Sequence, residues 1–233
     1  MGIDEMPNGT LPPSGNASQA RNAFALELEN GFEIEEFESF ALSETPPLSI
    51  FDGSKGVLAT VTGDAVVENI AGGRFPTSGV RQLETLAGGS ITLTFSERIF
   101  GLGFFATDAA DFFDSLEVAL TNELGDSIFL LIEAPQLDGN LLFWGFTDRT
   151  KTYNTISICN VGGAGDSRGF DDFLVAFGTQ IGDINRDGFV DLLDVEPFVE
   201  VLSNGHSQNE ADINRDGVVN LLDIAPFVEL LTH

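Results

Sequence analysis

The chain has 233 residues, of which 42% are hydrophobic, and its formal net charge at pH 7 is −27. A surface this acidic repels nucleic acid and anionic membranes, so partners of both classes are excluded. No apolar run reaches the roughly eighteen residues that suggest a membrane span, and the single cysteine, Cys159, excludes an internal disulfide.

Residues 1–22 contain Pro, Gly, Asn and Ser and few side chains that could pack, so we expect a flexible N-terminal arm. From residue 23 to 178, apolar and polar residues often alternate, as in half-buried β-strands. Pairs such as Gly88-Gly89 separate several of these runs. The expected strands are 24–29, 32–40, 56–62, 65–70, 90–95, 99–107, 115–121, 127–132, 141–147, 152–159 and 173–177.

The absence of helical stretches between these strands predicts a mainly β fold. We expect an antiparallel two-sheet β-sandwich, a jelly roll, over residues 23–178. Three segments carry a resemblance to the jelly-roll domains of bacterial secreted surface proteins and to carbohydrate-binding modules. They are SITLTFSERIFGLGFFATD (90–108), LLFWGFTD (141–148) and GFDDFLVAFG (169–178). This resemblance implies a carbohydrate as a partner. It also implies a third calcium ion at Asp171 or Asp172, with Glu27 or Glu33 from the first strands; the alternative is a solvated acidic edge.

Residues 1–205 contain no histidine. This excludes a Ser-His-Asp or Cys-His site and a His-ligated zinc site in the large domain. We therefore expect Cys159 to be a half-buried, inert thiol, and no phosphate-binding or dinucleotide-binding glycine motif is present.

A carboxylate pair for glycoside hydrolysis stays open, with Asp108, Asp111 and Asp114 as the best candidates against a solvated turn. Trp144 and Tyr153 are the two aromatic residues that could add to the phenylalanines in a sugar platform. Trp144 lies in a run that is apolar on both faces, which favours a core position.

Residues 179–182 are expected to form a short linker to a small domain at residues 183–233. This small domain contains two copies of the same motif. DINRDGFVDLLDVEPFVEVL (183–202) and DINRDGVVNLLDIAPFVELL (212–231) are identical at fifteen of twenty positions, at an offset of 29. Each copy opens with oxygen-bearing side chains on alternate residues followed by glycine, as in a twelve-residue calcium loop. The alternative, two Asx-type turns without metal, is disfavoured because every ligand position is filled in both copies.

The loop spacing assigns ligands at positions 1, 3, 5, 7, 9 and 12. In the first loop they are Asp183, Asn185, Asp187, the carbonyl of Phe189, Asp191 and Asp194; in the second, Asp212, Asn214, Asp216, the carbonyl of Val218, Asn220 and Asp223. We expect two calcium ions, and tighter binding in the first loop because it offers four carboxylates against three.

A duplicated calcium loop with an exit helix, no entering helix and Asp at position 12 resembles the dockerin domain. The resemblance covers residues 182–232 and implies docking onto a cohesin domain. It places the partner-reading residues at Leu192, Leu193, Leu221 and Leu222. The apolar residues after Pro197 and Pro226 are expected to pack the two halves together.

These observations predict a secreted or cell-surface, non-catalytic modular protein, although the chain shows no signal peptide. In this interpretation its calcium-loaded repeat binds a cohesin-like partner and its β-sandwich binds a carbohydrate. Two alternatives stay open: a polysaccharide-degrading glycoside hydrolase, or its accessory module, carrying a dockerin; and a structural surface protein in which calcium stabilises the packing of the domains. The oligomeric state does not follow from the sequence.

Overall fold

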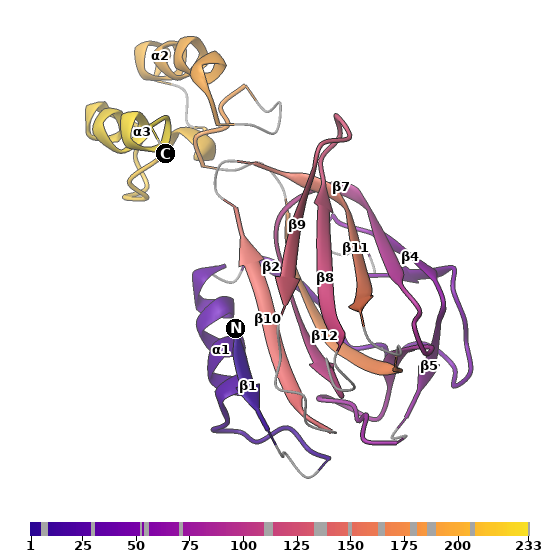
Figure 1. Cartoon of the computed structure of the whole chain (residues 1–233). Helices are drawn as coiled ribbons and strands as arrows, with labels where there is room; N and C mark the ends of the chain where they lie inside the picture. Colours follow the sequence, from indigo (N-terminus) through magenta and orange to yellow (C-terminus); the bar gives the residue numbers. More distant parts are fainter. Residues whose placement is uncertain are drawn as a thin grey trace. The chain divides into compact units, whose positions relative to one another are not determined.

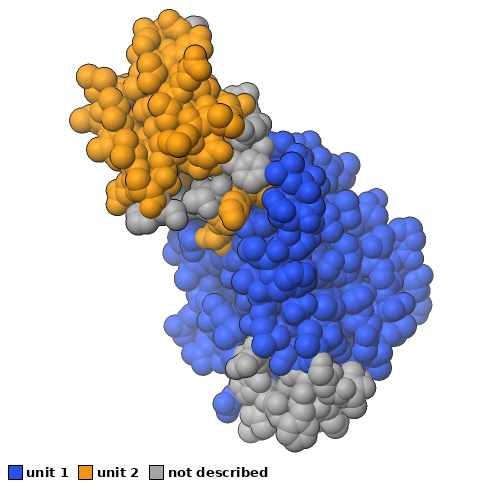
Figure 2. All heavy atoms as spheres, turned by 45° about the horizontal axis from the view of Figure 1, so that its top comes forward, with its two compact units in different colours: residues 1–146, 153–177 blue, residues 147–152, 178–233 orange. Residues whose placement is uncertain are grey.

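The chain forms two compact units, which Figure 2 distinguishes by colour. Unit 1 comprises Met1–Phe146 and Tyr153–Phe177, and unit 2 comprises Thr147–Thr152 and Gly178–His233. The computed structural model describes residues 1–5, 9–28, 31–51, 53, 56–69, 72–109, 114–132, 139–148, 151–162, 166–177, 181–185, 190–205 and 208–232.

The described residues of unit 1 form twelve strands and one helix. Figure 1 shows how these elements are arranged. The strands are β1 (Gly2–Asp4), β2 (Phe32–Glu35), β3 (Leu48–Ile50), β4 (Ala59–Gly63), β5 (Ala65–Glu68), β6 (Gln82–Thr85), β7 (Ile91–Thr107), β8 (Asp114–Thr121), β9 (Ser127–Ile132), β10 (Leu141–Thr147), β11 (Tyr153–Gly162) and β12 (Arg168–Phe177). The helix is α1 (Asn16–Glu27).

The 17-residue strand β7 belongs to both layers of the sandwich. Its first half pairs with β4 and β11, and its second half pairs with β12, all antiparallel. One layer therefore runs β3-β4-β7-β11-β8-β9, and the other contains β5, β6, β12, β7, β10 and β1, with β2 on β12. The apolar side chains between the layers form the main core, which includes Leu93, Phe104 and Phe173. The prediction of a mainly β antiparallel sandwich followed by a small helical pair is confirmed.

The predicted strand at residues 24–29 is wrong for its described residues 24–28, because they form the end of α1 and its C-cap; residue 29 lies outside the described part of the chain. Phe24 and Leu28 are four positions apart and both face inward, whereas Leu26 is 78% exposed. Helical spacing, rather than alternation, thus matches the burial. Phe24 packs on Phe143 of β10 with ring centroids 5.7 Å apart, so α1 covers the outer face of the second layer (Figure 1).

The predicted flexible arm at residues 1–22 is also wrong for its described residues, 1–5 and 9–22, which include β1 and most of α1. Strand β1 pairs with β10, and the Asp4 carboxylate accepts hydrogen bonds from the N–H groups of Asn16 (2.8 Å) and Ala17 (3.0 Å) at the start of α1. A Cβ added to Gly2 would lie 2.1 Å from the Asn16 carbonyl oxygen. Glycine therefore lets β1 and the helix approach each other.

Replacing Asp4 with alanine should lower the free energy of unfolding of the sandwich by about 1–2 kcal/mol, because two helix N–H groups lose their acceptor. Urea unfolding followed by the fluorescence of Trp144, the one tryptophan of the chain, measures this effect. Asp4→Asn keeps one acceptor oxygen and should lose less. Equal losses in both variants would contradict the capping role.

Unit 2 contains two short helices, α2 (Val195–Asn204) and α3 (Ile224–Leu230), each preceded by a single 3-10 turn. Pro197 and Pro226 lie in the first helical turns, where a missing N–H costs little. Phe198 and Phe227 pack against each other in a separate apolar core, with ring centroids 4.4 Å apart and ring planes tilted by 44°.

The linker predicted at residues 179–182 is wrong at its C-terminal end. Ile181 packs against the core of unit 2, and the N–H of Gly182 donates to the carbonyl of Glu210 (2.8 Å). These two residues therefore belong to the repeat; residues 179 and 180 lie outside the described part of the chain.

Candidate calcium-binding repeat

The second loop, residues 212–223, folds its oxygen-bearing side chains onto its own backbone. The Asp212 carboxylate accepts hydrogen bonds from the N–H groups of Asp216 (3.1 Å) and Gly217 (2.9 Å). Asn214 Oδ1 accepts from the N–H of Asp216, and Asp216 Oδ1 from that of Val218, both at 2.9 Å. Gly217 has a φ of 87°, which glycine adopts without steric cost, so the chain reverses at position 6 as predicted.

Asp223 closes this loop from its C-terminal end. Its side chain is fully buried; Oδ1 accepts from the N–H of Asn214 (3.0 Å) and Oδ2 from that of Asn220 (2.8 Å). Asn220 in turn caps the 3-10 turn Leu221–Asp223 by accepting from the N–H of Leu222 (2.8 Å). Positions 3, 9 and 12 are thereby tied together.

The described part of the first loop repeats this arrangement. Asp194 is fully buried and accepts from the N–H groups of Asn185 and Asp191, both at 2.9 Å. Asp191 accepts from the N–H of Leu193 (2.7 Å), and Asp183 is 1% exposed. The predicted ligands Asp187 and Phe189 lie outside the described residues.

These reciprocal caps were not predicted, although a sequence signal was present. Asp191 and Asp194, like Asn220 and Asp223, have the spacing of an N-cap residue and the N3 residue of a capping box. Position 12 thus has a structural role besides its expected role as a ligand.

The donor set of the second loop suits calcium, which takes six to eight oxygen ligands. It combines three carboxylates with the side-chain amides of Asn214 and Asn220 and the carbonyl of Val218. Within the described residues, no three His, Cys, Asp or Glu side chains form a metal-holding cluster by themselves.

The four leucines that follow the ligand positions face solvent. Leu192 and Leu193 are 77% and 67% exposed, and Leu221 and Leu222 are 75% and 68% exposed. Each pair begins a 3-10 turn whose third residue is the position-12 aspartate. The loops therefore present two equivalent apolar pairs on an acidic unit.

In unit 1, Asp171 and Asp172 of β12 are 1% and 6% exposed. Asp171 Oδ2 accepts from the N–H groups of Thr77 (2.7 Å) and Ser78 (2.9 Å), and Asp172 Oδ2 accepts from the Thr77 hydroxyl (3.0 Å). Glu27 is exposed at the end of α1 rather than on a first strand. The third calcium ion at Asp171, Asp172 and Glu27 stays a prediction.

Burial, together with the neighbouring Asp172 charge, raises the pKa of Asp171 from 3.8 to about 8, against the effect of its N–H donors. An acid with a raised folded-state pKa favours folding while it is protonated. Its contribution is complete below pH 4 and is lost as the pH rises from about 4 to 8. From pH 5 to pH 7 this group should lower the unfolding free energy by about 2–3 kcal/mol.

Replacing Asp172 with asparagine should reduce this loss, because the pKa of Asp171 falls when the neighbouring charge is removed. Asparagine tolerates the φ of 49° at this position. Urea unfolding of the sandwich in EDTA, followed by Trp144 fluorescence between pH 5 and pH 7, measures the effect. Glu97→Gln, at an exposed strand position, is the control. An unchanged pH dependence in Asp172→Asn would contradict the coupling of the two acids.

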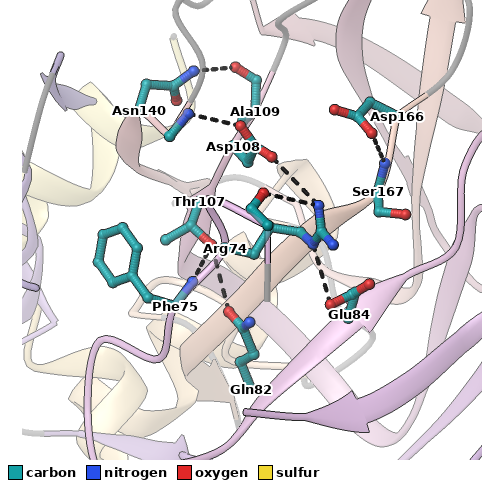
Figure 3. A network of polar contacts seen from close by, with 12 residues as sticks. Arg74, Phe75, Gln82, Glu84, Thr107, Asp108, Ala109, Asn140, Asp166 and Ser167 are labelled. Carbon is teal, nitrogen blue, oxygen red and sulfur yellow. Dashed lines mark hydrogen bonds and ion pairs between the residues drawn. The ribbon is translucent and has the colours of Figure 1, made fainter. Parts of the chain in front are cut away.

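Asp108, a catalytic candidate, has a structural environment (Figure 3). Asp108 is 2% exposed, and its Oδ2 lies 3.5 Å from Nη1 of Arg74. Its Oδ1 accepts a hydrogen bond from the N–H of Gly139 (2.7 Å). Arg74 also pairs with Glu84 at 3.1 Å. The network ties three distant segments together. Asp111 and the side chain of Asp114 lie outside the described residues.

Trp144 and Tyr153 are 9% and 3% exposed and belong to the main core, so the predicted core position of Trp144 is confirmed. Neither residue forms an exposed sugar platform. Cys159 is partly buried beside Glu117, and desolvation raises the pKa of its thiol, which disfavours the nucleophilic thiolate. None of the described helices is both long and apolar enough to cross a membrane.

Many solved structures are similar to the chain, including the following three. A family 61 carbohydrate-binding module in complex with β-1,4-galactotriose is 13% identical, covers 52% of this chain and 88% of its own, and has a TM-score of 0.35. The C-terminal family 22 carbohydrate-binding module of Clostridium thermocellum Xyn10B is 11% identical to the chain, with a TM-score of 0.36. The match covers 65% of this chain and 96% of the module. The K2 adhesin domain of Lys-gingipain is 10% identical to the chain, with a TM-score of 0.39. The match covers 64% of this chain and 99% of the adhesin domain.

No curated protein sequence matches the chain. Residues 181–227 match the dockerin type I domain. The resemblance to the dockerin domain, which was predicted from the duplicated loops, is therefore confirmed for this segment of the chain.

Proposed function

We propose that unit 2 is a calcium-dependent docking module that binds a cohesin-type domain of another protein. The observation that carries the proposal is the exposure of two equivalent leucine pairs, each fixed by a buried aspartate at position 12 of a calcium loop. Calcium orders the loops, and the ordered loops hold the leucines in a fixed arrangement. This function suits a secreted or cell-surface adaptor, because calcium is abundant outside cells.

Two calcium ions bind in the repeat, one in each loop. Calorimetric titration of the whole chain should give two ions, and Asp194→Ala or Asp223→Ala should each remove one. Glu196→Ala, an exposed acid of α2 outside the ligand positions, should remove none. A third ion in the whole chain that Asp172→Asn removes would support the site in the sandwich. No calcium binding at all would refute the proposal.

A second function, binding of a neutral carbohydrate by the sandwich, is favoured by one open sheet face. The strand registers align one hydroxyl side chain from each of five strands, in the order Thr60, Thr94, Thr155, Thr121 and Ser127. Thr62, Thr92 and Ser157 form a parallel row. Among the registered, described positions on this face, Glu117 is the one charged residue. Hydroxyl rows can exchange hydrogen bonds with sugar hydroxyls without burying charge.

Co-sedimentation with insoluble neutral polysaccharides such as cellulose, xylan and chitin tests this second function. Thr94→Lys combined with Thr155→Lys should abolish retention on the polysaccharide that binds, whereas Glu97→Gln should not. If the double variant binds the polysaccharide as well as the parent chain does, this face has no role in binding. Binding of the parent chain to none of the three polymers would also refute the role of this face.

A further inference from the structure

Unit 1 contains a cavity of about 320 Å³ whose lining includes no residue of the calcium loops or of the hydroxyl rows. Helix α1 contributes Arg21 and Asn22, β12 contributes Asp172, and the segments after β2 and before β6 contribute Glu36 and Ser78. Cavities that bind small molecules begin at about 300 Å³ and place a few polar groups on a partly apolar lining. The size of this cavity therefore suits one small ligand.

The charged side chains that line this cavity are not paired. Arg21 is half-buried, and its guanidinium forms no ion pair with a carboxylate of the described residues. Asp172 is 6% exposed; its Oδ2 accepts from the Thr77 hydroxyl (3.0 Å), whereas no described residue donates to its Oδ1. Charges that are removed from water are normally paired, because their desolvation is costly. In this cavity, one cation and one carboxylate oxygen still lack a partner.

Two further features of the lining restrict the chemistry of the ligand. The Ser78 hydroxyl is buried and has no hydrogen-bond partner among the described residues, so it can still donate or accept a hydrogen bond. Leu11, Pro13 and Phe105 form the apolar part of the lining. A ligand that matches all of these groups carries both charges and an apolar part.

We propose that this cavity binds a small zwitterion, namely an α-amino acid with an apolar side chain. The carboxylate of the ligand pairs with Arg21, and its ammonium group pairs with Asp172. Hydrogen bonds between charged groups are about twice as strong as those between neutral groups, so both contacts favour the zwitterion. The apolar lining takes the side chain of the ligand.

Other small ligands match only part of this lining. A simple amine leaves Arg21 unpaired, and a simple carboxylate leaves Asp172 unpaired. A calcium ion at Asp172 would share the cavity with the cation of Arg21 and brings no apolar part. A neutral sugar can form hydrogen bonds with both side chains but neutralises neither charge. Anions without an ammonium group are also repelled by the net charge of −27.

Calorimetric titration of the whole chain with L-leucine, in calcium and in EDTA, tests the proposal. L-Leucine should bind with a dissociation constant below about 1 mM. L-Leucinamide lacks the carboxylate and 4-methylpentanoate lacks the ammonium group, so each should bind at least about tenfold more weakly. D-Glucose, a neutral sugar, should bind more weakly than L-leucine.

Variants assign each charge of the ligand to its partner. Arg21→Gln should weaken L-leucine binding at least about tenfold and abolish the preference for L-leucine over leucinamide. Asp172→Asn should abolish the preference for L-leucine over 4-methylpentanoate. Arg98→Gln and Glu97→Gln, which remove one cation and one acid of β7 outside the cavity, should change neither preference. Retention of the Trp144 emission of the parent chain shows that each variant is folded.

The outcomes separate this site from its alternatives. No binding of L-leucine in either calcium or EDTA would overturn the proposal. Equal binding of L-leucine by the parent chain and by Arg21→Gln would also overturn it, because Arg21 would then not hold the carboxylate. Tighter binding of D-glucose than of L-leucine would assign the cavity to a sugar instead. Binding of L-leucine in EDTA alone would support the proposal and show that calcium competes with the ammonium group for Asp172.

Discussion

Removal of calcium with EDTA should unfold the C-terminal repeat and leave the β-sandwich folded. Among its described residues, unit 2 has a small core of seven buried apolar side chains. Its second loop carries three aspartates, Asp212, Asp216 and Asp223, within twelve residues. Each ion bound at about 100 times its dissociation constant contributes about 2.7 kcal/mol. Loss of two such ions also leaves the mutual repulsion of the carboxylates without compensation, so a domain of this size should lose most of its helical structure.

The chain provides separate signals for its two units. Trp144 and Tyr153 both lie in the core of the sandwich, and the chain has no other tryptophan or tyrosine. Far-ultraviolet circular dichroism near 222 nm should therefore lose the helical signal of α2 and α3 in EDTA, while the Trp144 emission stays unchanged. Readdition of calcium should restore the helical signal. Magnesium should restore much less, because it requires near-ideal octahedral geometry and keeps its waters.

Single substitutions separate the ligand role from general acidity. Asp194→Ala removes a buried carboxylate that accepts two backbone N–H groups, and should raise the calcium concentration that is needed to fold the repeat. Glu196→Ala removes a nearby exposed charge and should have no such effect. A helical signal that persists in EDTA would contradict calcium-dependent folding. A red shift of Trp144 in EDTA would instead indicate that calcium also stabilises the sandwich.

The calcium loops were predictable because their chemistry is local. Alternate oxygen ligands, a glycine at position 6 and an aspartate at position 12 lie within twelve residues, and the second copy repeats them. Strand β10 was predicted for the same reason, since its residues 141–146 form one uninterrupted apolar run. Local patterns therefore determine these elements without help from the rest of the chain.

The helix α1 and its cap were not predictable in this way. The apolar residues Phe24, Leu26 and Leu28 alternate as in a strand, and only contact with Phe143, more than a hundred residues away, selects the helical face. Asp4 likewise acquires its role from Asn16 and Ala17, which a flexible arm would never bring close. The burial of Asp171 depends on Thr77 and Ser78, which contact it across 94 and 93 residues. Such long-range contacts leave no local signal.

Replacing all four exposed leucines of the repeat with lysine should reduce the affinity for a cohesin-type partner at least about a hundredfold, because each leucine that anchors an interface contributes about 1–2 kcal/mol. The leucines lie outside the ligand positions and are at least 67% exposed, so calcium binding and the fold of the repeat should persist. Surface plasmon resonance against a panel of immobilised cohesin domains, in calcium and in EDTA, measures the effect.

The internal symmetry of the repeat allows a sharper test of the same surface. Variants of Leu192 and Leu193 alone, and of Leu221 and Leu222 alone, show whether one pair or both contact the partner. Leu124→Lys, at a 75% exposed leucine in the turn between β8 and β9, adds the same kind of charge to unit 1 and should leave the affinity unchanged. Because the two pairs are equivalent in exposure and in their caps, loss in only one variant would show that the partner contacts one copy. If the fourfold variant still binds calcium and retains its partner, the docking surface lies elsewhere on the repeat, and the exposed leucines do not mediate recognition.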